Sequence, residues 1–162
     1  MEAIKRKLKD FDGVAIDSRG CSRGVAMLCR KGLDVQLLSI SLLHIDVVIK
    51  DLGPSAEWCS TGLYGWPEHQ HKTLTGNLIR DLHSHSHLPS LVGGDYNEIW
   101  FNYAKRGGPD KPHNTLDLFH ETFSDRDLHD LDYSRYDFSW WNHRDDDQLV
   151  EERVDRYCAS VE

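Results

Sequence analysis

Cysteines are few in this sequence, and they are far apart. The four thiols form no C-x-x-C pair, so their spacing suggests neither a zinc knuckle nor a disulfide framework. Reduced thiols in an intracellular protein fit this pattern best. The four positions are Cys21, Cys29, Cys59 and Cys158.

Long apolar runs are also missing. The longest apolar stretch, Val35 to Ile49, is too short to span a bilayer and is interrupted by Ser39, Ser41, His44 and Asp46. The first residues, MEAIKRKLKDF, lack the apolar core of a signal peptide. We therefore expect a cytoplasmic or nuclear protein with no membrane partner, and the sequence does not distinguish the two compartments.

The chain has no excess of positive charge. It carries 19 Lys and Arg against 27 Asp and Glu, a net charge of -8, which argues against holding nucleic acid by bulk charge. Only residues 1–31 are basic, with eight Lys and Arg against four Asp and Glu. This basic segment fits either a phosphate contact or, more simply, a solvated helix face. Any nucleic-acid contact must be local.

Repeats, linkers and low-complexity segments are absent as well, so residues 1–162 are expected to form a single domain. Hydrophobic periodicity predicts helices at Glu2 to Lys9, at Lys72 to Ser84, and from a cap at Asn114 or Thr115. Strands are expected in hairpin-like groups with the longer helices placed late, which favours a layered α/β or α+β class with antiparallel or mixed sheets. The expected strands are Gly13 to Asp17, Val25 to Cys29, Val35 to Ser41, His44 to Ile49, Trp58 to Tyr64, Pro89 to Val92, Asp137 to Asn142 and Glu152 to Ala159.

The most informative segment is LVGGDYNEIW, Leu91 to Trp100, in which an apolar strand ends in two glycines, Asp95 and Asn97. A carboxylate and a carboxamide two residues apart project the same way from extended backbone. The glycines would let a bulky anionic substrate approach closely, as phosphate chemistry requires. The alternative is an Asx-type turn after a strand.

Further short motifs follow one another in a regular order along nearly the whole chain. They are Phe11-Asp12-Gly13, Asp17-Ser18-Arg19-Gly20, His44-Ile45-Asp46, Thr61-Gly62-Leu63-Tyr64-Gly65, Asp95-Tyr96-Asn97-Glu98-Ile99, Arg106-Gly107-Gly108, Asp130-Leu131 and Asp155-Arg156. In this order and spacing the chain resembles the endonuclease/exonuclease/phosphatase family. It is most similar to the endonuclease-like domain that precedes reverse transcriptase in plant LINE-type retrotransposons.

The resemblance implies a four-layer sandwich of two mixed β-sheets flanked by helices, and hydrolysis of phosphate esters, including DNA phosphodiesters, with Mg²⁺ or Mn²⁺. In the family's scheme Asp95 matches the residue that orients or deprotonates the attacking water, and it is also a metal-ligand candidate here. Asn97 and Tyr64 match groups that contact the phosphate. Asp155 matches the acid that orients a catalytic histidine.

Two departures from the family pattern bear on activity. The strand that carries the family's metal-binding Glu and the final Ser-Asp-His strand have no counterpart, so the domain is expected to be incomplete at both termini. We therefore expect little or no activity from the isolated chain and leave open whether it is an enzyme. The alternative is a non-catalytic remnant that acts as a binding or interaction module. Unpaired sheet edges predict marginal stability and self-association.

Other polar clusters have simpler interpretations. The His83 to His87 segment holds three imidazoles but is expected to be a solvated loop rather than a metal site. The acids Asp145 to Asp147 should face water. One of Trp140 and Trp141 should be core, because alternate residues of a strand face opposite ways. His44 and Asp46 are expected to be a satisfied structural pair.

Overall fold

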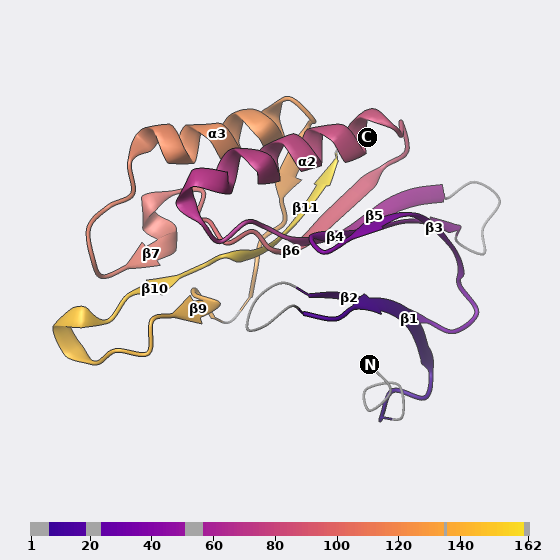
Figure 1. Ribbon diagram of the computed structural model, residues 1–162, viewed down its shortest axis with the longest axis horizontal. Helices are drawn as coiled ribbons and strands as arrows, with labels where there is room; N and C mark the ends of the chain where they lie inside the picture. The colour runs from indigo at the N-terminus through magenta and orange to yellow at the C-terminus, as the bar shows by residue number, and fades with distance from the viewer. Residues whose placement is uncertain (1–6, 19–23, 51–56, 135, 161–162) are drawn as a thin grey trace.

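A computed structural model describes residues 7–18, 24–50, 57–134 and 136–160 of the chain (Figure 1). Residues 2–6 of the expected helix at Glu2 to Lys9 lie outside these residues. The strands are β1 (Phe11–Ile16), β2 (Val25–Arg30), β3 (Asp34–Ser41), β4 (His44–Lys50), β5 (Glu57–Tyr64), β6 (Ser90–Asp95), β7 (Lys105–Arg106), β8 (Leu128–Asp130), β9 (Trp140–Trp141), β10 (Glu151–Glu152) and β11 (Asp155–Ser160). The two longer helices are α2 (Lys72–Ser84) and α3 (His113–Ser124), and three 3₁₀ turns are η1 (His69–His71), η2 (Asn102–Ala104) and η3 (Asp146–Gln148).

The central layer is a six-stranded mixed sheet in the order β3-β4-β5-β6-β11-β8. Only β5 and β6 run parallel among the pairs of this sheet in the described chain, and α2 connects them. The other pairs are antiparallel. A helical crossover is the usual way to join two parallel strands, which explains why the helix predicted over Lys72 to Ser84 falls between two predicted strands.

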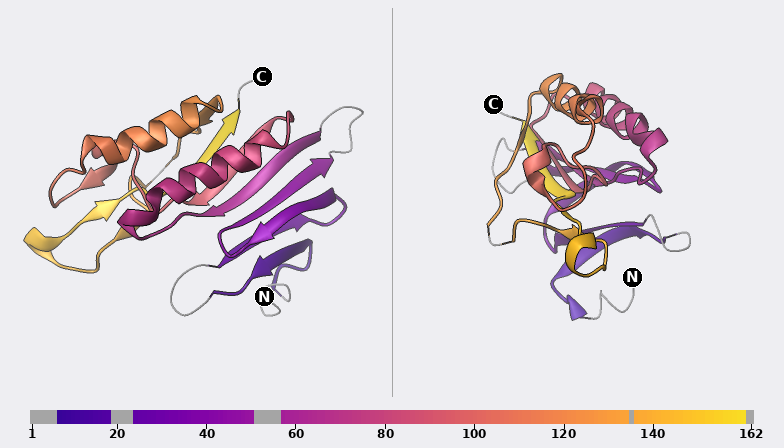
Figure 2. Two further views of the ribbon diagram at one scale, coloured as in Figure 1. Left: turned by 45° about the horizontal axis from the view of Figure 1, so that its top comes forward. Right: turned by 90° about the vertical axis from the view of Figure 1, so that its left-hand side faces the viewer.

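Both long helices lie on the same face of this sheet (Figures 1 and 2). The core between helices and sheet contains Ile79 from α2, Phe119 and Phe123 from α3, and Val92 and Cys158 from the sheet. The hairpin β1–β2 covers the opposite face, where Val25 packs with Ile45, Val47 and Ile49 of β4. The predicted layered α/β class is therefore confirmed.

A small sheet of short strands, in the order β7-β10-β9, lies at one end of the molecule. The strand expected from Asp137 to Asn142 is reduced to Trp140–Trp141, and the strand expected from Glu152 to Ala159 is divided into β10 and β11. The ladder breaks because the Arg153 amide donates to the Ala104 carbonyl and the Val154 and Asp155 amides donate to the Ser139 hydroxyl.

The start of α3 also differs from the prediction. Neither Asn114 nor Thr115 caps the helix, which begins at His113 after Pro112. Pro112 is the N-cap residue, with a ψ of 139°, and no side-chain hydrogen bond caps the helix. In the described residues no helix is both long enough and apolar enough to span a bilayer.

Candidate active site

Three of the four predicted site residues lie side by side in neighbouring strands. Asp95, at the end of β6, is the register partner of Tyr64 on β5 and of Asp155 on β11. Register partners project to the same face of a sheet. Leu63, one position before Tyr64, and Val92, three positions before Asp95, point into the helix-covered core. Residues an odd number of positions apart in a strand face opposite ways, so Tyr64, Asp95 and Asp155 face away from the helices.

The fourth residue, Asn97, lies in the turn after β6 with a φ of 53°. Its backbone amide donates to Asp95 Oδ1 at 2.7 Å, which makes an Asx-type turn. Its carboxamide Nδ2 donates to the Gly65 carbonyl at 2.8 Å. The Gly65 amide in turn donates to the Asp95 carbonyl at 2.7 Å. The turns after β5 and β6 are thus tied together, and the amide group that would contact a phosphate is bonded within the chain.

Asp95 is half-buried, and its electrostatic surroundings are mixed. Burial raises the pKa of its carboxyl group, and the charge of Asp155 raises it further. The hydrogen bond from the Asn97 amide and the charge of Lys72 lower the same pKa, but burial dominates. A carboxylate whose pKa is raised is a stronger base than one in free water, which is the property that a residue deprotonating water needs.

Lys72, the first residue of α2, supports the turn from beneath. It is buried, and its Nζ donates to the Asn97 carbonyl and lies 3.9 Å from Glu98 Oε2. Desolvation lowers the pKa of the Lys72 ammonium, and the charge of Glu98 counteracts this shift. Sequence reasoning assigned Lys72 no role, because the residue lies 25 positions from Asn97 in the chain.

Behind the turn, Lys72 belongs to a network of buried charges. Lys111 pairs with Glu98 and, at 3.0 Å, with Glu152 Oε2, and Lys105 Nζ lies 3.5 Å from Glu152 Oε1. Lys72, Glu98, Lys111 and Glu152 border a cavity of about 500 Å³. Because each acid faces two ammonium groups, the network fixes the backbone from Asn97 to Glu98 against α2 and β10.

Tyr64 and Asp95 line a cleft of about 400 Å³ between β2 and the strands β5, β6 and β11. The glycines before Asp95 have a different role from the one expected. A Cβ at Gly93 would lie 2.2 Å from Cδ1 of Tyr157, and a Cβ at Gly94 would lie 2.0 Å from the Leu63 carbonyl oxygen. The glycines are therefore required by the chain's own packing.

A divalent cation is implied by the family resemblance, and the residues of this site fit it poorly. No group of three or more His, Cys, Asp or Glu side chains that could hold a metal ion is found within the described ranges. The Asp95 carboxylate has one acidic neighbour, Asp155, and one of its oxygens, Oδ1, accepts a hydrogen bond from the Asn97 amide. Mg²⁺ prefers several oxygen ligands in near-octahedral geometry, so we assign no step to it.

The competing clusters are largely structural. His44 and Asp46 are not paired with each other: both ring nitrogens of His44 contact serine hydroxyls of Ser39 and Ser41 at 2.8 Å, and Asp46 accepts from Thr61 at 2.7 Å. Asp145 to Asp147 are exposed, as predicted. His85 and His87 are exposed beyond the end of α2, while His83 is half-buried in its last turn.

The expectation that one of the two tryptophans is core is wrong. Trp140 is 45% exposed and Trp141 is 51% exposed. They form a two-residue strand at the edge of the small sheet, so alternation along a strand buries neither of them. Trp140 lines the cavity beside the charge network, and Trp141 packs against the ring of His143.

No family model matches the sequence, and no curated protein matches it. Among solved structures, the endonuclease domain of TRAS1, a telomere-specific non-LTR retrotransposon, matches with a TM-score of 0.69 and 16% identity, over 98% of this chain and 76% of that domain. The human Nocturnin catalytic domain matches with a TM-score of 0.62 and 12% identity, over 99% of this chain and 65% of that one.

An endonuclease/exonuclease/phosphatase family protein from Bacteroides thetaiotaomicron matches with a TM-score of 0.58 and 16% identity, over 98% of this chain and 64% of that one. These identities establish the fold and nothing finer. The chain has the α/β sandwich fold of endonuclease/exonuclease/phosphatase proteins, and it spans about two thirds of the length of the last two neighbours.

Proposed function

We propose that the chain is a phosphodiester hydrolase domain of the endonuclease/exonuclease/phosphatase type, related to retrotransposon DNA endonucleases, with little or no activity in isolation. The observation that carries this proposal is the register that aligns Tyr64, Asp95 and Asp155 on one face at the ends of three adjacent strands. The likeness to the TRAS1 endonuclease domain supports the retrotransposon type. The plant LINE origin rests on the sequence motifs alone.

Each residue of the site has a role in this proposal. Asp95, made more basic by burial, orients the attacking water and accepts its proton. The Tyr64 hydroxyl donates a hydrogen bond to the phosphate, and Asn97 contacts the same group. Asp155, the register partner of Asp95, raises the pKa of the Asp95 carboxyl through its charge.

Weak activity follows from two features of the same site. The described residues offer no complete set of ligands for Mg²⁺ or Mn²⁺. The Asn97 carboxamide must also leave the Gly65 carbonyl before it can donate to a phosphate. Losing one member of a catalytic group typically costs several orders of magnitude in rate. Binding of DNA should be weak as well, because the chain has a net charge of -8.

The test is nicking of supercoiled plasmid, with and without abasic sites, in Mg²⁺ or Mn²⁺. We expect trace nicking that Asp95→Ala removes and that Asp147→Ala, in the exposed acidic loop, leaves unchanged. Trace nicking equal in wild type and Asp95→Ala would exclude the proposed site. Robust turnover abolished by Asp95→Ala would keep the site and overturn the claim of low activity, with His44 and Glu98 the next residues to substitute.

A non-catalytic binding module is the second candidate, and the hydrogen bond from Asn97 to Gly65 favours it, since it leaves the turn satisfied without a substrate. The two functions differ in their dependence on Asp95. If the chain is a binding module, wild type and Asp95→Asn should bind a fluorescent DNA oligonucleotide with equal affinity in an anisotropy titration. Neither of them should nick DNA. A hydrolase remnant would show trace nicking as wild type and none as Asp95→Asn.

A further inference from the structure

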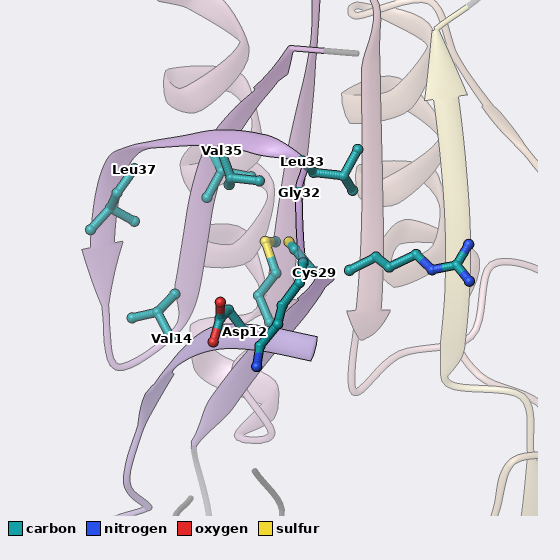
Figure 3. Close-up of a pocket in the computed structure, with 12 residues that line it drawn as sticks. Asp12, Val14, Cys29, Gly32, Leu33, Val35 and Leu37 are labelled. Carbon is teal, nitrogen blue, oxygen red and sulfur yellow. The ribbon is translucent and has the colours of Figure 1, made fainter. Parts of the chain in front are cut away.

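An apolar groove lies between the β1–β2 hairpin and the edge strand β3. It is on the face of the six-stranded sheet that the helices do not cover, and Asp95 does not line it. It has a volume of about 300 Å³. Its apolar lining includes Val14, Met27, Val35, Leu37 and Val47. Figure 3 shows Val14, Val35 and Leu37 around one side of this hollow. The core beneath the hairpin therefore opens toward β3 instead of being closed.

Strand β3, which borders the groove, is the outermost strand of the six-stranded sheet. Three large aliphatic side chains are exposed on it, namely Leu37 at 47%, Leu38 at 46% and Ile40 at 42%. The opposite edge is protected, because β8 has only three residues and its Asp130 is paired with Arg153 and Arg156. Exposed aliphatic side chains on one long edge mark a contact surface.

The ladder between β3 and β4 shifts register between Leu37 and Ser39, leaving Leu38 as a bulge. Bulges at sheet edges hinder addition of a further strand. On the face of the sheet toward the helices, the hydroxyl groups of Ser39 and Ser41 are hydrogen-bonded to the ring of His44. The contact surface is thus not a template for continuous strand pairing. It is a set of protruding aliphatic side chains beside an apolar hollow.

The charges around this surface are complementary. Asp34 is the only charged residue of β3, whereas Arg30 and Lys31 outnumber Asp12 around the groove. The protruding strand and the hollow therefore carry opposite charges, in a chain whose net charge is -8. This balance removes much of the repulsion that two copies would otherwise experience on approach.

We propose that β3 and the adjoining groove form the contact of a two-fold symmetric dimer of this chain. A two-fold contact requires one patch to hold both a protrusion and its matching hollow, and here Leu37, Leu38 and Ile40 lie beside the groove. The aliphatic side chains of one copy enter the groove of the other, and Asp34 approaches Arg30 and Lys31 of the partner. A stable contact of this kind requires about 1,000 Å² of buried surface in total.

Sedimentation velocity of the intact chain tests the proposal, at concentrations from about 2 to about 200 µM. We expect wild type to change from monomer to dimer across this range, and Leu37→Lys to remain monomeric throughout. Leu74→Lys is the matched control, because Leu74 is 44% exposed on α2 and far from the groove. It should dimerise like wild type. Circular dichroism confirms that each variant is folded, and Ile40→Lys replaces Leu37→Lys if the latter unfolds.

Three results would overturn the proposal. Wild type could remain monomeric at every concentration. If the groove then bound an apolar dye such as 8-anilinonaphthalene-1-sulfonate, the groove would be a ligand site. Leu37→Lys and Ile40→Lys could dimerise as strongly as wild type, which would place the contact elsewhere. Leu74→Lys could abolish the dimer, which would place it on α2. None of these measurements depends on nuclease activity, so their outcome is independent of the proposed hydrolase function.

Discussion

Asp155 lies directly across from Asp95 in the antiparallel pair of β11 and β6. The two carboxylates lie at the same end of this strand ladder, and the charge of Asp155 raises the pKa of Asp95. Asp155 is exposed, so water screens its charge, whereas half-buried Asp95 has its pKa raised. The site therefore places a carboxylate of increased basicity beside an exposed one.

Asp95→Asn should stabilise the fold at neutral pH. The folded-state pKa of Asp95 is raised, so ionisation costs stability, and that cost grows as pH rises from the unfolded-state value of about 4 through the folded value. The Asn carbonyl can still accept from the Asn97 amide. Thermal melts from pH 3 to 8 should show a higher Tm for the variant at pH 7 and no difference at about pH 3. A lower Tm at pH 7 would contradict the stated balance of burial and charge.

Gly94→Ala should be severely destabilising, by about 3 kcal/mol or more, because the added Cβ collides with backbone that cannot move freely. At this position φ is 141° and the Cβ would lie 2.0 Å from the Leu63 oxygen. Gly32→Ala is the control, with φ at 94° and open space around it, and should cost about 1 kcal/mol. Urea unfolding measures the free energy of unfolding of both variants. Equal losses of stability in the two variants would mean that backbone strain alone acts at Gly94, without a collision.

Glu98→Ala should cost about 3 to 5 kcal/mol, because it leaves Lys72 and Lys111 without their shared partner in a buried setting. Glu57→Ala removes a partner from an exposed ion pair with Lys50 and should cost less than about 0.5 kcal/mol. Chemical denaturation of the two variants measures both losses. If Glu98→Ala were as mild as Glu57→Ala, the network would be open to water and could not hold the Asn97 turn.

Cys158 should resist thiol reagents in the folded chain. It is fully buried between helices and sheet, and desolvation raises its pKa to about 12. Since the thiolate is the reactive form, alkylation at pH 8 should require global unfolding. Cys29 is half-buried beside the groove and should react before Cys158, although burial raises its pKa as well. Peptide mass spectrometry after timed labelling with iodoacetamide gives the order, and rapid labelling of Cys158 would show that the core opens locally.

Local patterns predicted most of the regular structure. The helix over Lys72 to Ser84 and the strands ending at Tyr64 and Ser41 follow from side-chain periodicity and agree with the structure at those boundaries. Periodicity fails where tertiary hydrogen bonds decide the backbone path, as at Arg153 and Val154. It also could not show that the tryptophans of β9 lack a covering layer, since burial depends on elements distant in sequence.

The site was only partly predictable for the same reason. Asp95 and Asn97 are linked by a local turn that two residues suffice to suggest. The alignment of Asp155 with Asp95 depends on the register between strands 60 residues apart in the chain, and Lys72 reaches Asn97 from another element. Only the resemblance to a family could suggest such long-range pairs from sequence, and it did so for Tyr64 and Asp155 but not for Lys72.

The position of β11 between β6 and β8 affects how the chain folds during synthesis. Because β11 lies between β6 and β8, β6 lacks its second neighbour and β8 lacks its partner strand until residues near Cys158 have left the ribosome. The hairpins from β1 to β5 can form early from local contacts, whereas Val92 and Leu128 must wait for a late strand to complete their core. The nascent chain therefore presents an open β6 edge to chaperones and to other nascent chains from the emergence of Asp95 until that of β11.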